Sequence, residues 1–475
     1  MDHTQVNLNL NLNLNSVSGS PVEIDHKYEF IVHTFGCKVN TYDTGLIQNN
    51  LNTHGFIGLS NQKTDISVHT AIHIINTCAV TAEATQQAVR LIRKIKSRHP
   101  LATVVVTGCA AQVDTEAFEK LSGADLIVAN SHKGMLPQII DQYFKRVDQQ
   151  KIYQKIFKSN IFKKEDLEPG GGEELSHTRS FLKIQDGCNS FCSFCIIPYA
   201  RGKSRSLSIE QLIKKIGELE NKGIHEVVLT GVHIGDYEDT VDNQIKNIED
   251  LVEMILLKTK IPRLRLSSLE PIELSDRLLD LYQNERLCPH FHMSIQSANT
   301  DVLQQMKRKY SETEVRVSLN KIQLKVKNAY VGMDVIAGFP TETDEQFENT
   351  YKVLTETSWT RLHVFPYSER PGTRAASMTQ LSMMRRKDRA QRLRELSLHR
   401  LQAEALKQIG THKKVLVLNK WHPTNQGISR DYWNINLNLS VTEQWQYKNC
   451  ELQVQIESIN IKGPDVILSA KLVNP

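Results

Sequence analysis

Short runs of β-branched residues recur through the first part of the chain. They occupy residues 28–34, 71–77 and 102–107, and each is followed by a tight loop of small residues with one cysteine. Such runs predict β-strands, and apolar residues at helix spacing predict a helix over 88–95. This repetition predicts a parallel α/β sheet, in which the loops that follow the strands gather at one edge. We therefore expect Cys37, Cys78 and Cys109 to meet in space.

A second alternation of strands and helices is predicted between residues 181 and 367. The strand candidates are 181–185, 226–230, 263–267, 291–296, 331–336 and 361–366. Helices fit between them, and Ser208 with Gln211, like Thr343 with Gln346, has the spacing of a capping box. Six β/α units predict a partial (β/α)6 barrel similar to a TIM barrel, whose chemistry lies at the carboxyl ends of the strands.

The rest of the pattern divides the chain into five parts. Residues 384–407 predict a long basic helix, and strand-like alternation at 415–418, 452–456 and 466–469 predicts a small β-barrel. A Gly-rich stretch near residue 170 interrupts every pattern and indicates a linker. We expect a low-complexity disordered tail at 1–25, a sheet domain at 26–145, a linker at 146–177, a barrel with its basic helix at 178–407 and a β-module at 408–475.

Composition excludes several classes of protein. The 475 residues are 40% hydrophobic and 23% charged, which argues against general disorder. The excess of 58 Lys and Arg over 53 Asp and Glu gives a net charge of +5, which permits a nucleic-acid partner without requiring one. No apolar run is long enough to predict a transmembrane helix. Since the amino-terminus lacks the pattern of a signal peptide, we expect a cytoplasmic protein without stable disulfides.

The strongest chemical signal is the CxxxCxxC motif of Cys188, Cys192 and Cys195, placed in the loop after the first barrel strand. Three thiolates on one loop can bind three irons of a [4Fe–4S] cluster and leave the fourth iron open. Structural zinc is the alternative, but it usually takes four ligands. A fourth ligand could come through space from Cys288, His290 or His292.

These motifs together carry a resemblance to a known family. A CxxxCxxC loop at the mouth of a (β/α)6 barrel resembles the radical S-adenosylmethionine superfamily. The three amino-terminal cysteines and the β-module resemble its methylthiotransferase branch. Gly36-Cys37-Lys38-Val39-Asn40 and the run from Cys195 to Gly202 (CIIPYARG) are similar to the MtaB-type members, which act on threonylcarbamoyladenosine next to the tRNA anticodon.

The resemblance implies cofactors and roles for the cysteines. Cys188, Cys192 and Cys195 would hold a [4Fe–4S] cluster that binds S-adenosylmethionine and cleaves it reductively to a 5′-deoxyadenosyl radical. Cys37, Cys78 and Cys109 would hold a second [4Fe–4S] cluster, which carries the sulfur to be methylated and transferred. An electron donor such as flavodoxin or ferredoxin and a tRNA anticodon stem-loop are the implied partners, with no membrane.

The resemblance also implies contacts to S-adenosylmethionine and RNA. Gly231, Gln296, Ser297 and Gly338 match strand-end positions of the family, although packing explains each of them equally well. Arg308 also fits a family motif, although a solvated basic run explains it as well. The β-module resembles a TRAM domain, which binds RNA. The candidates for stacking on bases are Trp421, Tyr432, Trp433, Trp445 and Tyr447, with Arg430 beside Tyr432 as the first pair to test.

Some alternatives stay open at this point. Cys288 and Cys450 match no cluster position, and we expect both to fill the core. Isopentenyladenosine in tRNA or a ribosomal protein could be the target of the same chemistry. A zinc-stabilised RNA-binding protein without catalysis is the alternative from a different class.

Overall fold

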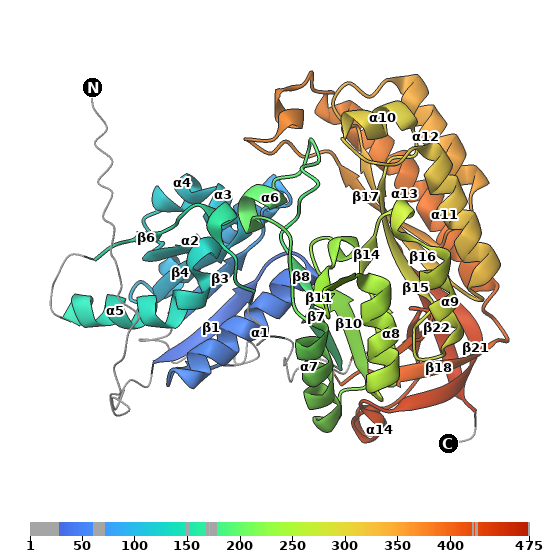
Figure 1. Ribbon diagram of the computed structural model, residues 1–475, viewed down its shortest axis with the longest axis horizontal. Coiled ribbons are helices and arrows are strands. Elements are labelled where there is room, and N and C mark those ends of the chain that lie inside the picture. Colours follow the sequence, from blue (N-terminus) through green and yellow to red (C-terminus); the bar gives the residue numbers. More distant parts are fainter. Residues whose placement is uncertain are drawn as a thin grey trace.

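The computed structural model describes residues 28–59, 72–148, 153–167, 171, 178–419, 422 and 426–473 (Figure 1). The predicted tail at 1–25 and parts of the predicted linker lie outside these residues. The chain folds into a sheet domain drawn blue to teal, a partial barrel drawn green to orange, and a small red barrel. None of the described helices has the length and apolar character needed to cross a membrane.

The first domain is a six-stranded parallel sheet in the order β2-β1-β3-β4-β5-β6. The strands are β1 (Glu29–Thr34), β2 (Ile57–Gly58), β3 (Ile72–Thr77), β4 (Thr103–Gly108), β5 (Leu126–Ala129) and β6 (Ile156–Phe157). Its helices are α1 (Lys38–Thr53), α2 (Ala82–Arg98), α3 (Cys109–Val113), α4 (Thr115–Glu119) and α5 (Leu136–Asp148). Every residue of β3 is buried, as expected for the centre of a sheet covered on both faces. The parallel sheet predicted from the β-branched runs is confirmed.

The central part is an open arc of parallel strands at six positions, one of which is shared by the consecutive strands β13 and β14. Its order is β7-β10-β13 and then β14-β15-β16-β17, with β13 running directly into β14. The strands are β7 (Arg179–Lys183), β10 (Glu226–Thr230), β13 (Arg263–Leu266), β14 (Ser268–Leu269), β15 (His290–Gln296), β16 (Tyr330–Ala337) and β17 (Arg361–Pro366). The predicted (β/α)6 partial barrel is confirmed, with each strand within two residues of its expected position.

Helices cover the outer face of this arc and shield one continuous apolar core. They are α7 (Ile209–Asn221), α8 (Ile248–Lys258), α9 (Asp276–Asp280), α10 (Thr300–Gln305), α11 (Glu312–Lys325), α12 (Asp344–Glu356) and α13 (Met383–Leu406). The short helix α6 (Ile197–Arg201) packs instead against α3 of the first domain. Both predicted capping boxes are present, at Ser208 with Gln211 and at Thr343 with Gln346. The loops contain two short antiparallel strand pairs. They are β8 (Gln185–Asp186) with β9 (Arg205–Ser206), and β11 (Asp239–Val241) with β12 (Gln244–Lys246).

The carboxyl-terminal part is a closed five-stranded barrel in the order β18-β19-β20-β22-β21. Its elements are β18 (His412–Val417), β19 (Gly427–Ser429), β20 (Asn434–Asn436), α14 (Val441–Tyr447), β21 (Glu451–Lys462) and β22 (Asp465–Leu472). It packs against the amino ends of the central strands, where Arg263 at the start of β13 donates hydrogen bonds to Glu451 and to the carbonyl of Ser429. The central barrel's carboxyl ends therefore remain available for a site.

Candidate active site

The three amino-terminal cysteines meet at the carboxyl edge of the first sheet. Cys37 caps the start of α1 after β1, Cys78 follows β3, and Cys109 opens α3 after β4. Because β1, β3 and β4 are parallel neighbours, their following loops converge at one edge. Burial, together with the nearby thiols of Cys109 and Cys37, raises the pKa of Cys78 to about 12. The structure thus brings together the first predicted cysteine set.

Two glycines allow this close approach. Gly36 has φ +99°, and a Cβ added there would lie 2.6 Å from Cys78 Sγ. Gly108 has φ +95°, and a Cβ there would lie 2.4 Å from the carbonyl oxygen of Thr77. Any other residue at either position would push the cysteine loops apart.

The second cysteine set lies on the loop after β8 at the carboxyl end of the central barrel. The loop is held closed by hydrogen bonds from the Cys188 N–H to the Gly202 carbonyl (3.1 Å) and from the Cys195 N–H to the Cys192 carbonyl (3.0 Å). Ser193 fixes the loop to the barrel, because its N–H donates to the carbonyl of Met306 (3.1 Å). Burial raises the pKa of Cys195 to about 12. The loop therefore presents its thiols from a fixed backbone.

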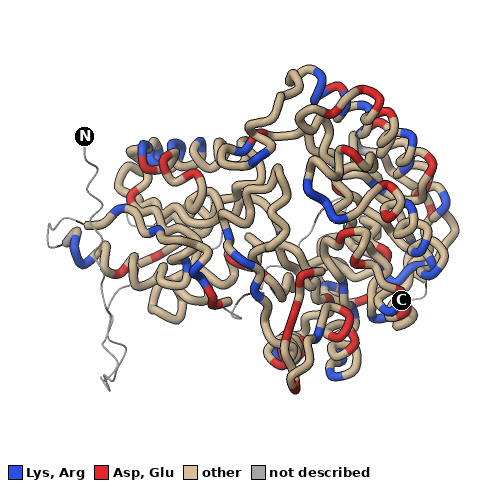
Figure 2. The backbone as a smooth tube through the Cα atoms, turned by 45° about the horizontal axis from the view of Figure 1, so that its top comes forward, with Lys and Arg blue, Asp and Glu red and all other residues tan. Residues whose placement is uncertain are grey.

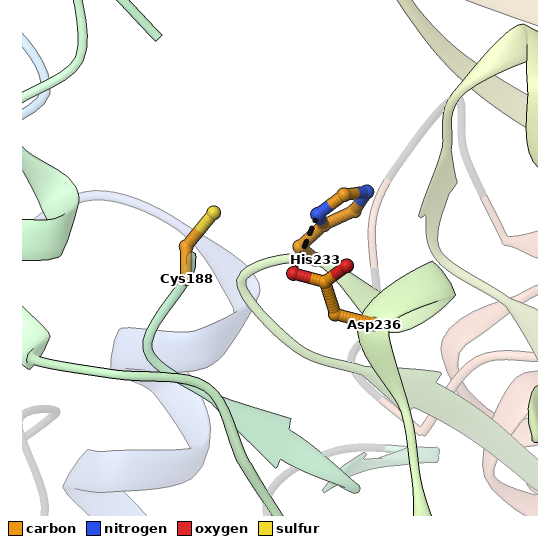
Figure 3. Close-up of side chains that lie close together, drawn as sticks. All are labelled: Cys188, His233 and Asp236. Atoms are coloured by element: carbon orange, nitrogen blue, oxygen red, sulfur yellow. Dashed lines mark ion pairs between the residues drawn. The ribbon is translucent and has the colours of Figure 1, made fainter. Parts of the chain in front are cut away.

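A cavity of about 80 Å³ adjoins this loop. His233 is one of the residues that line it, and its Nδ1 lies 3.1 Å from Asp236 (Figure 3). Its Nε2 contacts Glu273. Burial on its own would lower the pKa of His233, but hydrogen bonds with Asp236, Cys188 and Glu273 raise it above the ordinary value. The lining residues are Ser190, Cys192, His233, Asp236, Glu270, Ile272, Glu273, Lys307, Arg308 and Lys309.

Charged groups of both signs line this cavity. Arg308 is paired with Glu270 and lies over the ring of Phe194, 5.7 Å from its centroid. Burial raises the pKa of Glu270 despite the neighbouring Arg308. Sequence reasoning included Arg308 but missed His233, Asp236, Glu270 and Glu273. The available signal was their position, because all four come shortly after barrel strands.

A buried ionic network joins the two cysteine sites. Arg201, on α6, donates to Asp186 (2.9 Å), Asn40 (2.7 Å) and Asp43 (3.0 Å). Lys183 from β7 bridges Asp43 (2.7 Å) and Asp186 (3.0 Å). Asn40 is three residues after Cys37, and Asp186 is two residues before Cys188. The network therefore fixes the first cysteine loop relative to the second.

The predicted contacts to S-adenosylmethionine are not among the residues that line the cavity. A Cβ on Gly231 would lie 2.9 Å from the Gln185 side chain, whose oxygen accepts the His233 N–H, so Gly231 helps to position His233. Ser297 is buried and shares a hydrogen bond with Thr350. Gly338 has φ +73° and packs against Arg386. Gln296 ends β15 with φ 59° and is half-buried.

The pair chosen first for RNA contact proves to be part of an internal interface. Arg430 donates to Glu451 (2.9 Å) and to the Glu285 carbonyl (2.6 Å). Tyr432 stacks on His290 with ring centroids 3.9 Å apart, and the guanidinium group of Arg265 lies over the Tyr432 ring, 4.7 Å from its centroid. The interpretation of this pair as an RNA contact is wrong, since the central barrel occupies both side chains.

The other aromatic candidates divide between core and surface. Trp433 is buried and Tyr447 packs against the core of the small barrel, whereas Trp445 is 54% exposed beside Lys448. Trp421 lies outside the described residues. Trp445 is therefore the one described candidate of the five that offers an open ring face.

The structure also shows the surroundings of the basic helix α13 and of the two cysteines outside the cluster motifs, Cys288 and Cys450. On α13, Arg389 pairs with Glu342 (2.5 Å) and Arg392 with Glu348 (2.6 Å), so much of its positive charge is neutralised by its neighbours. Figure 2 shows acidic and basic residues interspersed over the helices of the central barrel. Cys288 is buried as expected, but the expectation for Cys450 is wrong, because it is exposed beside the end of α14.

The interface around Tyr432 gives a prediction about stability. Tyr432→Ala should lower the free energy of unfolding by about 3 kcal/mol, because a half-buried ring that stacks on His290 is lost. Trp445→Ala, the matched change on the exposed helix α14, should alter it by less than about 0.5 kcal/mol. Denaturant unfolding followed by circular dichroism measures both. Equal losses of stability in the two variants would contradict the assignment of Tyr432 as a packed ring and Trp445 as an exposed one.

Both cysteine sets have donors suited to iron–sulfur clusters. Thiolates are the soft ligands that such clusters take, and each set supplies three of them from converging or fixed loops. Among the described residues, one group places a cysteine thiol within metal-binding distance of His and Asp side chains, and it consists of Cys188, His233 and Asp236. Cys288 and His290, considered earlier as zinc ligands, lie instead at the amino end of β15, away from the CxxxCxxC loop.

Comparisons with known proteins agree with this geometry. Residues 182–354 match the radical SAM superfamily, and residues 29–129 match the group described as Uncharacterized protein family UPF0004. The chain is 36% identical to the threonylcarbamoyladenosine tRNA methylthiotransferase MtaB of Rickettsia prowazekii, over 81% of this chain and 87% of that protein. It is 35% identical to the enzyme of the same name from Aquifex aeolicus, over 85% and 95% respectively.

A solved structure supports the fold. The radical S-adenosylmethionine methyltransferase TsrM from Kitasatospora setae superimposes with a TM-score of 0.51 at 12% identity, over 74% of this chain and 75% of that one. The arc of strands and its cysteine loop thus define a radical S-adenosylmethionine enzyme. Within that class, the chain belongs to the methylthiotransferase family, among its MtaB-type members. Its cofactors are S-adenosylmethionine and two [4Fe–4S] clusters.

Proposed function

We propose that this enzyme transfers a methylthio group to C2 of N6-threonylcarbamoyladenosine next to the tRNA anticodon. The observation that carries the proposal is the identity of 36% and 35%, over most of the chain, to two enzymes named for this nucleoside. The two cysteine sets joined by a buried network give a physical basis for it, because sulfur and radical chemistry must reach the same substrate atom.

Each cysteine set has its own role in this proposal. Cys188, Cys192 and Cys195 hold the cluster whose chemistry is the reductive cleavage of S-adenosylmethionine. Cys37, Cys78 and Cys109 hold the auxiliary cluster, which carries the sulfur to be transferred. One S-adenosylmethionine donates the methyl group, and a second one is cleaved with an electron from a donor protein such as flavodoxin or ferredoxin. The protein orients both sites and excludes water from the radical.

The cavity beside Cys192 suits the methionine end of S-adenosylmethionine, which carries an ammonium group and a carboxylate. Asp236 and Glu273 provide negative charge for the ammonium group, and Arg308 provides positive charge for the carboxylate. Asp236 and Glu273 are therefore the candidates for an acidic contact to this ammonium group. Gly231 contributes indirectly, through Gln185 and His233.

The division of the chain follows the same proposal. Residues 26–145 hold the auxiliary cluster, 146–177 connect the domains, 178–407 form the radical core and 408–475 form a TRAM-like RNA-binding module. With Arg430 and Tyr432 occupied, Trp445 on α14 and Lys448 directly after this helix are the described residues of this module that best suit RNA. Because tRNA is modified where it is made and used, we extend the proposal to a cytoplasmic enzyme.

Mass spectrometry of tRNA from cells that lack the gene tests the substrate. We expect threonylcarbamoyladenosine to lose its methylthio group completely, and a plasmid copy of the wild-type gene to restore it. A copy with Cys192→Ala should not restore it. Persistence of the modified nucleoside would contradict the proposal, and loss of methylthiolated isopentenyladenosine or of a ribosomal-protein modification would reassign the target.

Metal content separates the enzyme from a zinc-stabilised RNA-binding protein. After anaerobic reconstitution, two four-iron clusters correspond to about eight irons per chain and a brown chromophore. Colourless protein with stoichiometric zinc would contradict the proposed chemistry.

A further inference from the structure

Three aromatic side chains gather beside the CxxxCxxC loop, and we call them the aromatic trio: Phe162, Phe191 and Tyr199. They come from the short helix η2 (Ile161–Lys163), from the loop between Cys188 and Cys192, and from α6. Their ring centroids are 6.1 Å (Phe162 to Phe191), 6.0 Å (Phe162 to Tyr199) and 5.9 Å (Phe191 to Tyr199) apart. The three rings therefore form one contiguous cluster.

The trio is open to solvent. Phe191 is 39% exposed, Tyr199 is 43% exposed and Phe162 is half-buried. Adjacent aromatic rings with this much exposed surface form an apolar patch of the kind that marks an interaction site. Phe191 also has φ 46°, a left-handed conformation that is costly for a bulky residue and is typical of functional loops.

The trio lies between the two cysteine sites. Ser190 and Cys192, the neighbours of Phe191 in the chain, both line the cavity beside the CxxxCxxC loop. On the other side, the Asn130 side-chain amide donates to the carbonyl of Ala200, next to Tyr199, at 2.9 Å, and lies 3.6 Å from Cys109 Sγ. The segments that carry Phe191 and Tyr199 therefore contact both cysteine sites.

Exposed cations lie on the chain segments next to the trio and the cavity. They are Lys163, Lys203, Lys307, Lys309 and Arg374. Lys163 is next to Phe162, Lys307 and Lys309 line the cavity, and Arg374 begins the turn whose Ala375 N–H donates to Ser193. None of the five forms an ion pair with another described residue, so their charge is available to a polyanion such as RNA.

We propose that the aromatic trio is a stacking platform for the unpaired bases that flank the modified adenosine in the RNA substrate. Every base has a flat π-face, and aromatic side chains bind unpaired bases by stacking on them. The surrounding cations then contact the phosphates. This inference rests on the proposed function, because it takes the anticodon loop as the RNA that enters.

Binding of RNA by the reconstituted full-length enzyme tests the platform. Fluorescence anisotropy under anaerobic conditions would measure the affinity for an anticodon stem-loop that carries threonylcarbamoyladenosine. Phe191→Ala and Tyr199→Ala should each weaken binding about tenfold, the size expected for one lost base stack. Phe191→Tyr and Tyr199→Phe, which keep a ring, should bind like the wild type.

Two controls separate stacking from general damage. Tyr153→Ala removes an aromatic residue that is 36% exposed and precedes the amino end of β6, whereas the trio's Phe162 follows the carboxyl end of this strand, and it should have no effect. A blunt-ended RNA duplex with the same number of nucleotides should bind the wild type and the alanine variants equally, because it offers no unpaired base. Iron content and RNA-independent cleavage of S-adenosylmethionine with dithionite should stay unchanged in all variants.

Several outcomes would overturn the inference. They are unchanged affinity for the stem-loop in both alanine variants, equal weakening of binding to the stem-loop and to the duplex, or a defect that appears with a protein electron donor but not with dithionite. The last outcome would make the trio a docking site for the donor. Failure of the wild type to bind or modify the stem-loop would instead count against the proposed function itself.

Discussion

Cys192→Ala should abolish cleavage of S-adenosylmethionine, whereas Cys78→Ala should permit cleavage and abolish methylthio transfer. The physical reason is that the two residues belong to separate donor sets, one after β8 and one at the edge of the first sheet. When one of the three thiolates is lost, the cluster is lost too, because no further protein ligand replaces that thiolate. We expect a fall of at least about a hundredfold in the affected step, since the cofactor carries the chemistry.

Two products measure the two steps separately. Chromatography of 5′-deoxyadenosine reports cleavage, and mass spectrometry of the stem-loop RNA reports transfer. Iron should fall from about eight to about four per chain in either variant. Cys450→Ala is the matched control, because that thiol is exposed and distant in sequence from both sets, and it should leave iron and both products unchanged. Equal loss of cleavage in Cys78→Ala and Cys192→Ala would contradict the separate roles.

Local patterns predicted most of the fold because β-branched runs and caps encode elements within a few residues. The strand at 226–230 and the capping box at Ser208 appear as expected. Short elements such as β5 were missed, since four residues carry little periodicity. The cysteines could be grouped because parallel strands bring their following loops to one edge, a rule that needs only the order of elements.

Residues that act across distant segments could not be predicted in the same way. Arg430 has the same chemistry whether it faces RNA or Glu451, and only the packing of the small barrel on the central strands decides between them. His233 and Glu273 are single polar residues in separate loops, and their contact depends on the curvature of the barrel. Cys450 shows that a cysteine without a motif carries no information about burial.

The network around Arg201 gives the second large effect. Arg201→Met should lower the free energy of unfolding by about 3–5 kcal/mol, because removing one partner leaves buried Asp43 and Asp186 with too little positive charge. Burial alone would raise the pKa of Asp43, but Lys133, Lys183 and Arg201 hold it well below the ordinary value. The stabilisation is therefore present at neutral pH and is lost only as the pH falls below the usual range of aspartate.

The functional consequence of Arg201→Met should be specific to transfer. Because Arg201 joins Asn40 after Cys37 to Asp186 before Cys188, its loss should uncouple the positions of the two cysteine loops. We expect methylthio transfer to fall more steeply than formation of 5′-deoxyadenosine, and Arg201→Lys to restore part of the stability. Arg277→Met breaks a surface ion-pair group whose arginine is 47% exposed, so it should cost less than about 1 kcal/mol and leave both products unchanged. A parallel fall of cleavage and transfer in Arg201→Met would show that the network supports only the fold, and would exclude a role in positioning the two sites.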